Sequence, residues 1–165
     1  MLPESPVDHG TVVVEHAINV PVGRAYAAFA DTKERTSWAA PTESAVFTYE
    51  EADFRIGGRD VARCGPKDDP RFRVETRYVN IVPERCVVAI ESITEHATPL
   101  SVNITTTEFV PDNQSTKVKV TVQVSSFVGD DMIRNTEAGH AGSLANMARY
   151  LEQAQRDDER VWAKQ

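Results

Sequence analysis

Three titratable residues are the strongest candidates for proton-transfer chemistry: His16, Asp60 and His140. His16 shares its strand parity with Val14, so its ring is expected to face the interior, either as a ligand contact or proton-transfer group or as a hydrogen-bonded core residue. His140 lies four residues before Leu144 in a helical pattern, and it either faces the mouth of a cavity or lies partly exposed on the helix. With both rings turned inward, the two histidines are the best acid–base candidates.

Asp60 is expected to share one face of a strand with Ala62 and Cys64, because alternate side chains of a strand point the same way. A carboxylate on a buried face must be paired, hydrogen-bonded or protonated, and such groups are concentrated at functional sites. Alternatively, a bulge after Gly57 and Gly58 reverses the parity and exposes Asp60 to water. The sequence leaves both interpretations open.

Aromatic and flexible side chains spaced along the chain are expected to line a pocket, although such residues also form ordinary hydrophobic cores. The residues expected to contact a ligand are Tyr26, Trp38, Phe47, Phe54, Asp60, Tyr78, His140, Leu144 and Met147. Whether these residues form a packed core or the wall of a cavity depends on how much space remains unfilled between them.

The sequence carries no recognisable metal or cofactor motif. Histidines at positions 9, 16, 96 and 140 have neither H-x-H nor H-E-x-x-H spacing, so no metal site is expected. G-x-G-x-x-G, Walker and G-x-S-x-G motifs are also absent, which argues against nucleotide cofactors and serine hydrolysis. No cofactor is therefore expected.

Hydropathy patterns predict the elements that would position these residues. Valines at positions 118, 120, 122 and 124 alternate with polar residues, as in a strand with one buried face. Asp31 and Glu34 resemble a capping box for a short helix that reaches Trp38. Strands are expected over residues 11–20, 45–54, 59–65, 71–81, 85–95, 100–109 and 118–125, and helices over residues 22–29, 31–38 and 130–153.

This order of elements predicts an α+β helix-grip fold. A curved, seven-stranded antiparallel sheet would wrap around a long C-terminal helix of about 25 residues, with two short helices after the first strand. The expected division is an N-terminal tail over residues 1–10, one domain over residues 11–155, and a helix end or tail over residues 156–165. Such a fold leaves a cavity between sheet and helix, which is where a site is expected.

Several short motifs, taken in order, resemble those of one family. They are Pro21, Ala25-Tyr26, Phe29, Trp38-Ala39-Ala40-Pro41, Asp53-Phe54-Arg55-Ile56-Gly57-Gly58-Arg59 and Val82-Pro83-Glu84-Arg85. Together they resemble the START-like (SRPBCC) proteins of the activator of heat-shock-protein-90 ATPase homologue-like family. The resemblance runs from about Val12 to Leu151. It implies a birch-pollen-allergen-like fold and a cavity that binds hydrophobic ligands.

The chain departs from this family pattern in two respects. Asp60 and Ala62 stand where the family usually carries aromatic residues, which implies a more open and more polar cavity. The eukaryotic chaperone activator also has a second domain that contacts the chaperone, for which 165 residues leave no room. The resemblance therefore does not imply chaperone activation.

Composition restricts the partners of this protein. The 18 Lys and Arg against 25 Asp and Glu give a net charge of −7, which disfavours nucleic acid and anionic lipid. No apolar run reaches the roughly 18 residues that span a bilayer, and Cys64 and Cys86 lack C-x-x-C spacing. The expected location is the cytoplasm, without a membrane partner. An exposed strand edge could support a homodimer.

The sequence favours a binding protein over an enzyme. The first hypothesis is a cavity that holds a small hydrophobic or amphipathic molecule. One alternative is an enzyme of the cyclase or dehydratase type, in which His16, Asp60 or His140 moves protons on a polyketide-like substrate. Another is an interaction module for a chaperone or a different protein.

Overall fold

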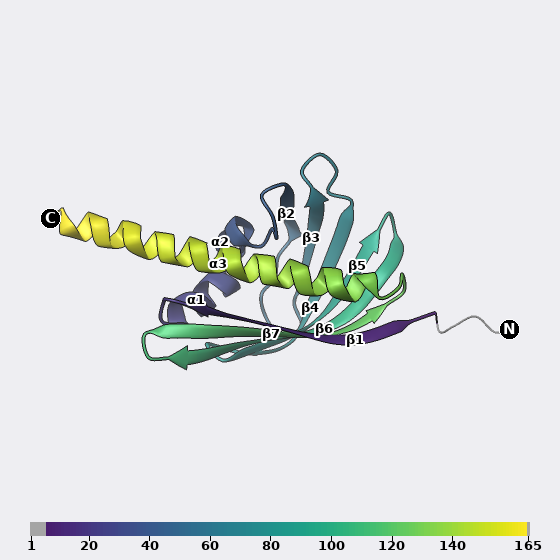
Figure 1. The fold of residues 1–165 in the computed structure, drawn as a ribbon, viewed down its shortest axis with the longest axis horizontal. Coiled ribbons are helices and arrows are strands. Elements are labelled where there is room, and N and C mark those ends of the chain that lie inside the picture. The colour runs from purple at the N-terminus through teal and green to yellow at the C-terminus, as the bar shows by residue number, and fades with distance from the viewer. Residues whose placement is uncertain (1–5, 165) are drawn as a thin grey trace.

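A computed structural model describes residues 6–164 of the chain; residues 1–5 of the expected N-terminal tail lie outside the described part. Seven strands form one antiparallel sheet that curves around a long helix (Figure 1). The elements are β1 (Asp8–Ile18), α1 (Val22–Ala30), α2 (Thr32–Trp38), β2 (Ala45–Glu51), β3 (Arg59–Pro66), β4 (Phe72–Val82), β5 (Cys86–Glu95), β6 (Thr98–Asp112), β7 (Ser115–Ser126) and α3 (Asp131–Ala163). The predicted helix-grip fold is confirmed.

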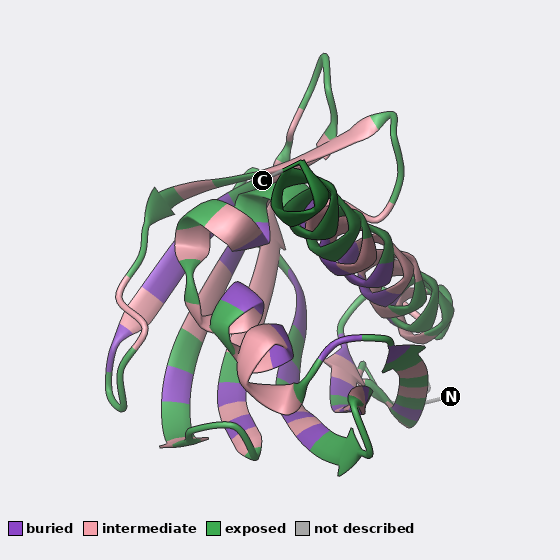
Figure 2. Ribbon diagram, turned by 90° about the vertical axis from the view of Figure 1, so that its left-hand side faces the viewer, coloured by how far each residue is buried: buried purple, intermediate pink, exposed green. Residues whose placement is uncertain are grey.

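The strands lie in the order β1-β7-β6-β5-β4-β3-β2, and β2–β3, β4–β5 and β6–β7 are antiparallel hairpins. Figure 2 shows buried and exposed residues alternating along the strands. In β7 the four alternating valines, Val118, Val120, Val122 and Val124, are each at most 4% exposed. The two-residue period therefore identifies the inner face of the sheet correctly.

The two short helices begin as the sequence predicts. Pro21 stands immediately before α1, where its fixed φ suits a helix start. The Asp31 carboxylate accepts a hydrogen bond from the backbone N–H of Glu34 at 3.1 Å and caps α2. In α1, however, the fully buried residues are Ala25 and Ala28. The larger side chains beside them, Val22, Tyr26 and Phe29, are only partly buried.

Several element ends differ from the prediction. Strand β1 begins at Asp8 rather than at residue 11, and β2 ends at Glu51 after a register shift between Tyr49 and Glu51, so Phe54 lies beyond the strand. Helix α3 continues to Ala163 instead of ending near Gln153. Its last turns carry polar contacts such as Gln153 to Asp157 at 3.0 Å, three or four residues apart on the helix surface. Such pairs stabilise a helix without an apolar stripe.

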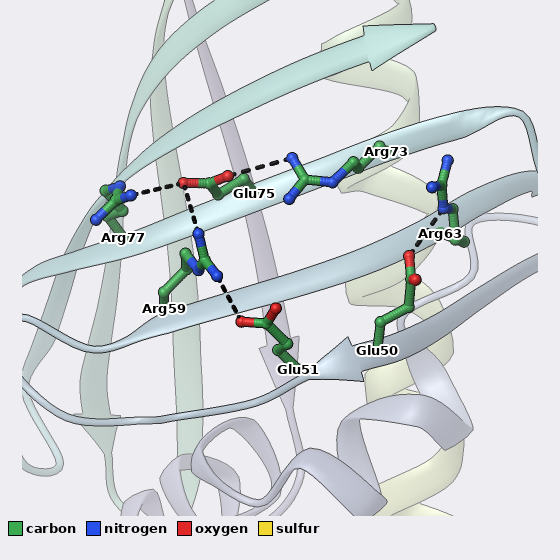
Figure 3. A network of polar contacts seen from close by, with 7 residues as sticks. All are labelled: Glu50, Glu51, Arg59, Arg63, Arg73, Glu75 and Arg77. Carbon is green, nitrogen blue, oxygen red and sulfur yellow. Dashed lines mark hydrogen bonds and ion pairs between the residues drawn. The ribbon is translucent and has the colours of Figure 1, made fainter. Parts of the chain in front are cut away.

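The face of β2–β4 opposite Asp60 carries a chain of ion pairs (Figure 3). Glu75 contacts three guanidinium groups, with Arg77 at 3.0 Å and Arg73 at 3.2 Å as the two shorter contacts. Burial acts to raise the pKa of Glu75, but these arginines outweigh it and the pKa is lowered. Charged side chains such as Glu50 and Glu51 on the edge strand β2 disfavour its pairing with a strand of another chain.

Helix α3 packs chiefly along β1, at one end of the sheet. Leu144, Met147 and Leu151 of α3 are buried there with Ile18 and Val20. The inner faces of the central strands are consequently not all covered by helix, and this incomplete cover leaves the space in which the site lies. No helix within residues 6–164 combines the length and the apolar character needed to cross a bilayer.

Candidate functional site

Two adjoining cavities lie between the inner face of the sheet and α3. The outer cavity has a volume of about 410 Å³, and its apolar lining includes Phe47, Phe72, Val74, Ile93, Leu100 and Met132. The inner cavity, about 150 Å³, reaches Arg35, Tyr49 and Tyr78. Both cavities are lined by Ala39, Phe47, Glu91, His140 and Ser143. The two cavities therefore adjoin at these residues, and the inner one borders a group of polar side chains.

A buried polar cluster forms the end of the inner cavity. Arg35 of α2 donates from Nη1 to Asp60 Oδ2 at 2.7 Å and to Tyr78 Oη at 2.8 Å. The Tyr78 hydroxyl in turn donates to Asp60 Oδ2. The second carboxylate oxygen, Oδ1, accepts from the backbone N–H of Asp53 at 2.9 Å. Asp60 is thus buried and paired, and its exposure through a bulge is excluded.

Aromatic rings surround the guanidinium of Arg35. The carbon at its centre lies 5.0 Å from the ring centroid of Tyr49, 5.6 Å from Phe29 and 5.8 Å from Phe54. Burial acts to lower the pKa of Arg35, but Tyr49, Tyr78 and Asp60 outweigh it and the pKa is raised. Burial also raises the pKa of Tyr49 to about 12 and that of Tyr78 still further. At neutral pH the cluster is therefore a charged arginine and two neutral phenols.

Arg35 has unused donors. The residue is 6% exposed, yet its Nε and Nη2 have no hydrogen-bond partner among the described residues. Buried nitrogen donors are nearly always paired in folded proteins. Arg35 lines the inner cavity, and a guanidinium with unpaired donors is a group that can bind an oxygen acceptor.

Glu91 and His140 line the junction of the two cavities from β5 and α3 respectively. Glu91 accepts a long hydrogen bond of 3.4 Å from the side-chain amide of Asn103. A carboxylate and an imidazole that line one space can transfer protons to a bound molecule.

The sequence-predicted ligand contacts divide between cavity wall and core. Trp38, Phe47, Tyr78, His140 and Leu144 line one or both cavities. Asp60 is hydrogen-bonded to Arg35, which lines the inner cavity. Met147 is fully buried in the core. Tyr26 and Phe54 pack together in an aromatic cluster with centroids 6.3 Å apart.

The three candidate acid–base residues lie on different elements. His16 is half-buried on β1 opposite Val118, Asp60 is buried on β3, and His140 is on α3. Of these only His140 lines either cavity. The structure therefore does not bring the three together around one space.

Sequence reasoning missed Arg35, Tyr49 and Glu91. Arg35 precedes Trp38 by three residues, and this spacing places both on one face of α2. Glu91 shares its strand parity with Ala89 and Ile93, which indicates the inner face of the sheet. These two spacings could have indicated Arg35 and Glu91. A charged side chain on a short helix is ordinarily solvated, however, and neither spacing indicates which residue the charge would pair with.

The thiol of Cys64, in the wall of the outer cavity, is expected to react slowly. Burial raises its pKa to about 11, so at pH 8 only about one thiol in a thousand is the reactive thiolate. In a Cys86→Ser variant, which leaves Cys64 as the single thiol, the rate of alkylation by iodoacetamide should rise about tenfold per pH unit up to about pH 10. A rate that levels off near pH 9 would contradict this expectation.

Residues 6–164 contain no group of three or more His, Cys, Asp or Glu side chains placed to hold a metal ion.

Comparison with known proteins gives one family and many similar folds. The family model described as Activator of Hsp90 ATPase homolog 1-like protein matches residues 19–152. Protein Mll3558 from Rhizobium loti is 29% identical, with a TM-score of 0.76 over 87% of this chain and 98% of that one. An uncharacterized protein from Rhizobium leguminosarum is 23% identical, with a TM-score of 0.74 over 89% and 97% of the two chains.

An AHSA1-like protein from Aeromonas hydrophila is 19% identical, with a TM-score of 0.68 over 88% of this chain and 94% of that one. At such identity the likeness concerns the fold alone. No curated protein matched the chain.

Proposed function

Because the chain belongs to the Activator of Hsp90 ATPase homolog 1-like family and has cavities between its sheet and its long helix, we propose that it binds a small hydrophobic or amphipathic molecule. The ligand would occupy the space between the inner face of the sheet and α3. Its apolar part would lie in the outer cavity and a smaller part in the inner cavity.

The observation that carries this proposal is the pair of adjoining cavities. The outer cavity, at about 410 Å³, lies within the range of about 300–1,000 Å³ that is typical of small-molecule sites, and the inner cavity adds about 150 Å³. The outer wall is mostly aliphatic and aromatic, and a few polar groups converge at the inner end. Such a combination favours retention of an apolar body with one oriented polar group.

Trp38 provides a direct test of occupancy. The chain has two tryptophans, of which Trp38 lines the inner cavity and Trp162 is 76% exposed near the end of α3. A Trp162→Phe variant therefore reports on the site alone. Titration with an uncharged apolar probe such as Nile red should quench Trp38 and increase the fluorescence of the probe, with one probe bound per chain.

Filling the outer cavity from α3 should weaken that binding. A Cβ added at Gly139 meets nothing within 4 Å, and Gly139 lines the outer cavity. A Gly139→Phe variant should fold, because phenylalanine suits a helix better than glycine, but it should bind Nile red about tenfold or more weakly. Fluorescence titration measures both affinities.

Gly139→Ala is the matched control, because it also replaces glycine by a better helix former but adds only one methyl group to the cavity. It should bind Nile red with nearly the wild-type affinity. Equal affinities of the phenylalanine and alanine variants would place the probe elsewhere. No saturable binding of any apolar probe would refute the proposed function.

A second candidate function is a cyclase- or dehydratase-type activity on a polyketide-like substrate. The observation that favours it is that Glu91 and His140 line the same junction. In that case Glu91→Gln or His140→Asn would abolish turnover while Nile red still bound. Unchanged turnover in both variants would exclude these two residues as the acid and the base.

A further inference from the structure

The hydrogen bonds of Arg35 are concentrated on one nitrogen. Nη1 alone serves both Asp60 and Tyr78, while Nε and Nη2 are buried without a partner in the described chain. A guanidinium has five N–H donors in a fixed plane. The Tyr49 hydroxyl interacts with the Arg35 guanidinium, but neither Nε nor Nη2 makes a well-aligned hydrogen bond within the described chain. These donors therefore remain able to bind an acceptor from outside the protein.

Unpaired donors at this position have a physical cost. Burial removes the N–H groups from water, and an unsatisfied buried donor is rare in folded proteins. The protein nevertheless fixes the arginine there by the Asp60 ion pair and by the surrounding rings. Since Arg35 lines the inner cavity, an acceptor within that cavity would satisfy its free edge.

We propose that Arg35 is the polar anchor of the ligand, and that its free Nε and Nη2 donors bind a neutral oxygen acceptor, such as a ketone or aldehyde carbonyl. This inference rests on the proposed function and specifies the class of ligand. The carbonyl lies in the inner cavity beside Tyr49 and Tyr78, and the apolar body extends into the outer cavity.

The charges around the cavity favour a neutral acceptor over a carboxylate. The charge of Arg35 is already balanced by Asp60, which is 2% exposed. Glu91 contributes a further carboxylate to the wall of the same cavity, where His140 is the remaining titratable group besides the tyrosines. An anionic ligand would bring a third negative group close to one arginine, and like charges in a space with little water repel strongly.

Three naphthalene derivatives with nearly the same shape test this inference on the unmodified protein. 2-Ethylnaphthalene has no acceptor, 2-acetylnaphthalene has a neutral carbonyl, and 2-naphthoate has an anionic acceptor. Calorimetric titration should give an affinity for 2-acetylnaphthalene about tenfold or more above those of the other two, because a hydrogen bond to a charged donor adds to the apolar contact.

The anchor is identified by a nuclear magnetic resonance measurement and a conservative variant. The Nε–H resonance of Arg35 should shift with 2-acetylnaphthalene but not with 2-ethylnaphthalene. Arg35→Lys keeps a positive donor for Asp60 but removes the planar free edge. This variant should bind both compounds with equal affinity, close to that of wild type for 2-ethylnaphthalene.

The outcomes separate this inference from the proposed function. Equal binding of the ethyl and acetyl compounds to wild type would overturn the anchor and leave apolar binding intact. Tightest binding of 2-naphthoate would overturn the neutral acceptor. Failure of all three compounds and of Nile red would overturn both proposals. If Arg35→Lys does not fold, the wild-type affinities and the shift of the Arg35 resonance still test whether Arg35 binds the carbonyl.

Discussion

Substituting alanine for Asp60 is expected to lower the free energy of unfolding by about 3–5 kcal/mol, because the change leaves the Arg35 guanidinium charged and uncompensated inside the protein. The side chains of Arg35 and Asp60 are only 7% and 3% exposed, and their shortest contact is 2.7 Å. The substitution also removes the acceptor for Tyr78 and for the backbone of Asp53. Denaturant unfolding of the wild type and the variant measures the difference.

The matched control is an ion pair on the opposite face of the same sheet. Glu50 and Arg63 are 2.8 Å apart, but their side chains are 50% and 44% exposed (Figure 3). Glu50→Ala should cost less than about 1 kcal/mol, since water already solvates both groups. Losses of similar size in the two variants would mean that the Asp60 pair is hydrated in solution.

A double variant distinguishes the contribution of the ion pair to stability from the cost of leaving one charge buried without a partner. Arg35→Met with Asp60→Leu replaces both charges by apolar groups of comparable size, and such replacements of buried pairs are often neutral or stabilising. It should recover most of the stability lost in Asp60→Ala. The same variant should lose the preference for 2-acetylnaphthalene, because the anchor is absent. A stable protein without that preference would indicate that the pair serves binding rather than folding.

The fold was predictable because its signals are local. The alternating valines of β7 and the Asp31 cap of α2 each depend on side chains a few residues apart, and both occur as predicted. The end of α3 was predicted wrongly, because an apolar stripe marks where a helix is buried and not where it stops. Polar helix formers carry α3 ten residues past the last residue of the expected helix, Gln153 to Ala163.

The site was less predictable, because its pairings are distant in sequence. Strand parity places Asp60 on the inner face, but its partner Arg35 lies 25 residues earlier on a helix. Tyr78 was expected in the wall of the cavity, yet its hydrogen bond to the carboxylate depends on the register of β3 and β4. The packing of α3 along β1 leaves space for the cavities. No single sequence motif predicts this packing.

Two glycines of α3, three residues apart, should respond oppositely to the same substitution. A Cβ at Gly142 would lie 2.5 Å from the carbonyl oxygen of Pro41, whereas a Cβ at Gly139 meets nothing within 4 Å. Gly142→Ala is therefore expected to destabilise the protein by about 1–3 kcal/mol through overpacking. Gly139→Ala should stabilise it by up to about 1 kcal/mol through helix propensity. Thermal unfolding should show melting temperatures that change in opposite directions.

The contact at Gly142 also closes one side of the binding site. Next to it, Ser143 Oγ donates to the carbonyl oxygen of Ala39 at 2.6 Å, and the side-chain amide of Asn146 donates to that of Ala40. Both Ala39 and Pro41 line the outer cavity. A displacement of α3 that accommodates the new methyl group must strain these bonds and reshape the cavity wall. Gly142→Ala should therefore weaken Nile red binding while Gly139→Ala leaves it nearly unchanged, and equal responses of the two variants would show that α3 does not rest on Pro41.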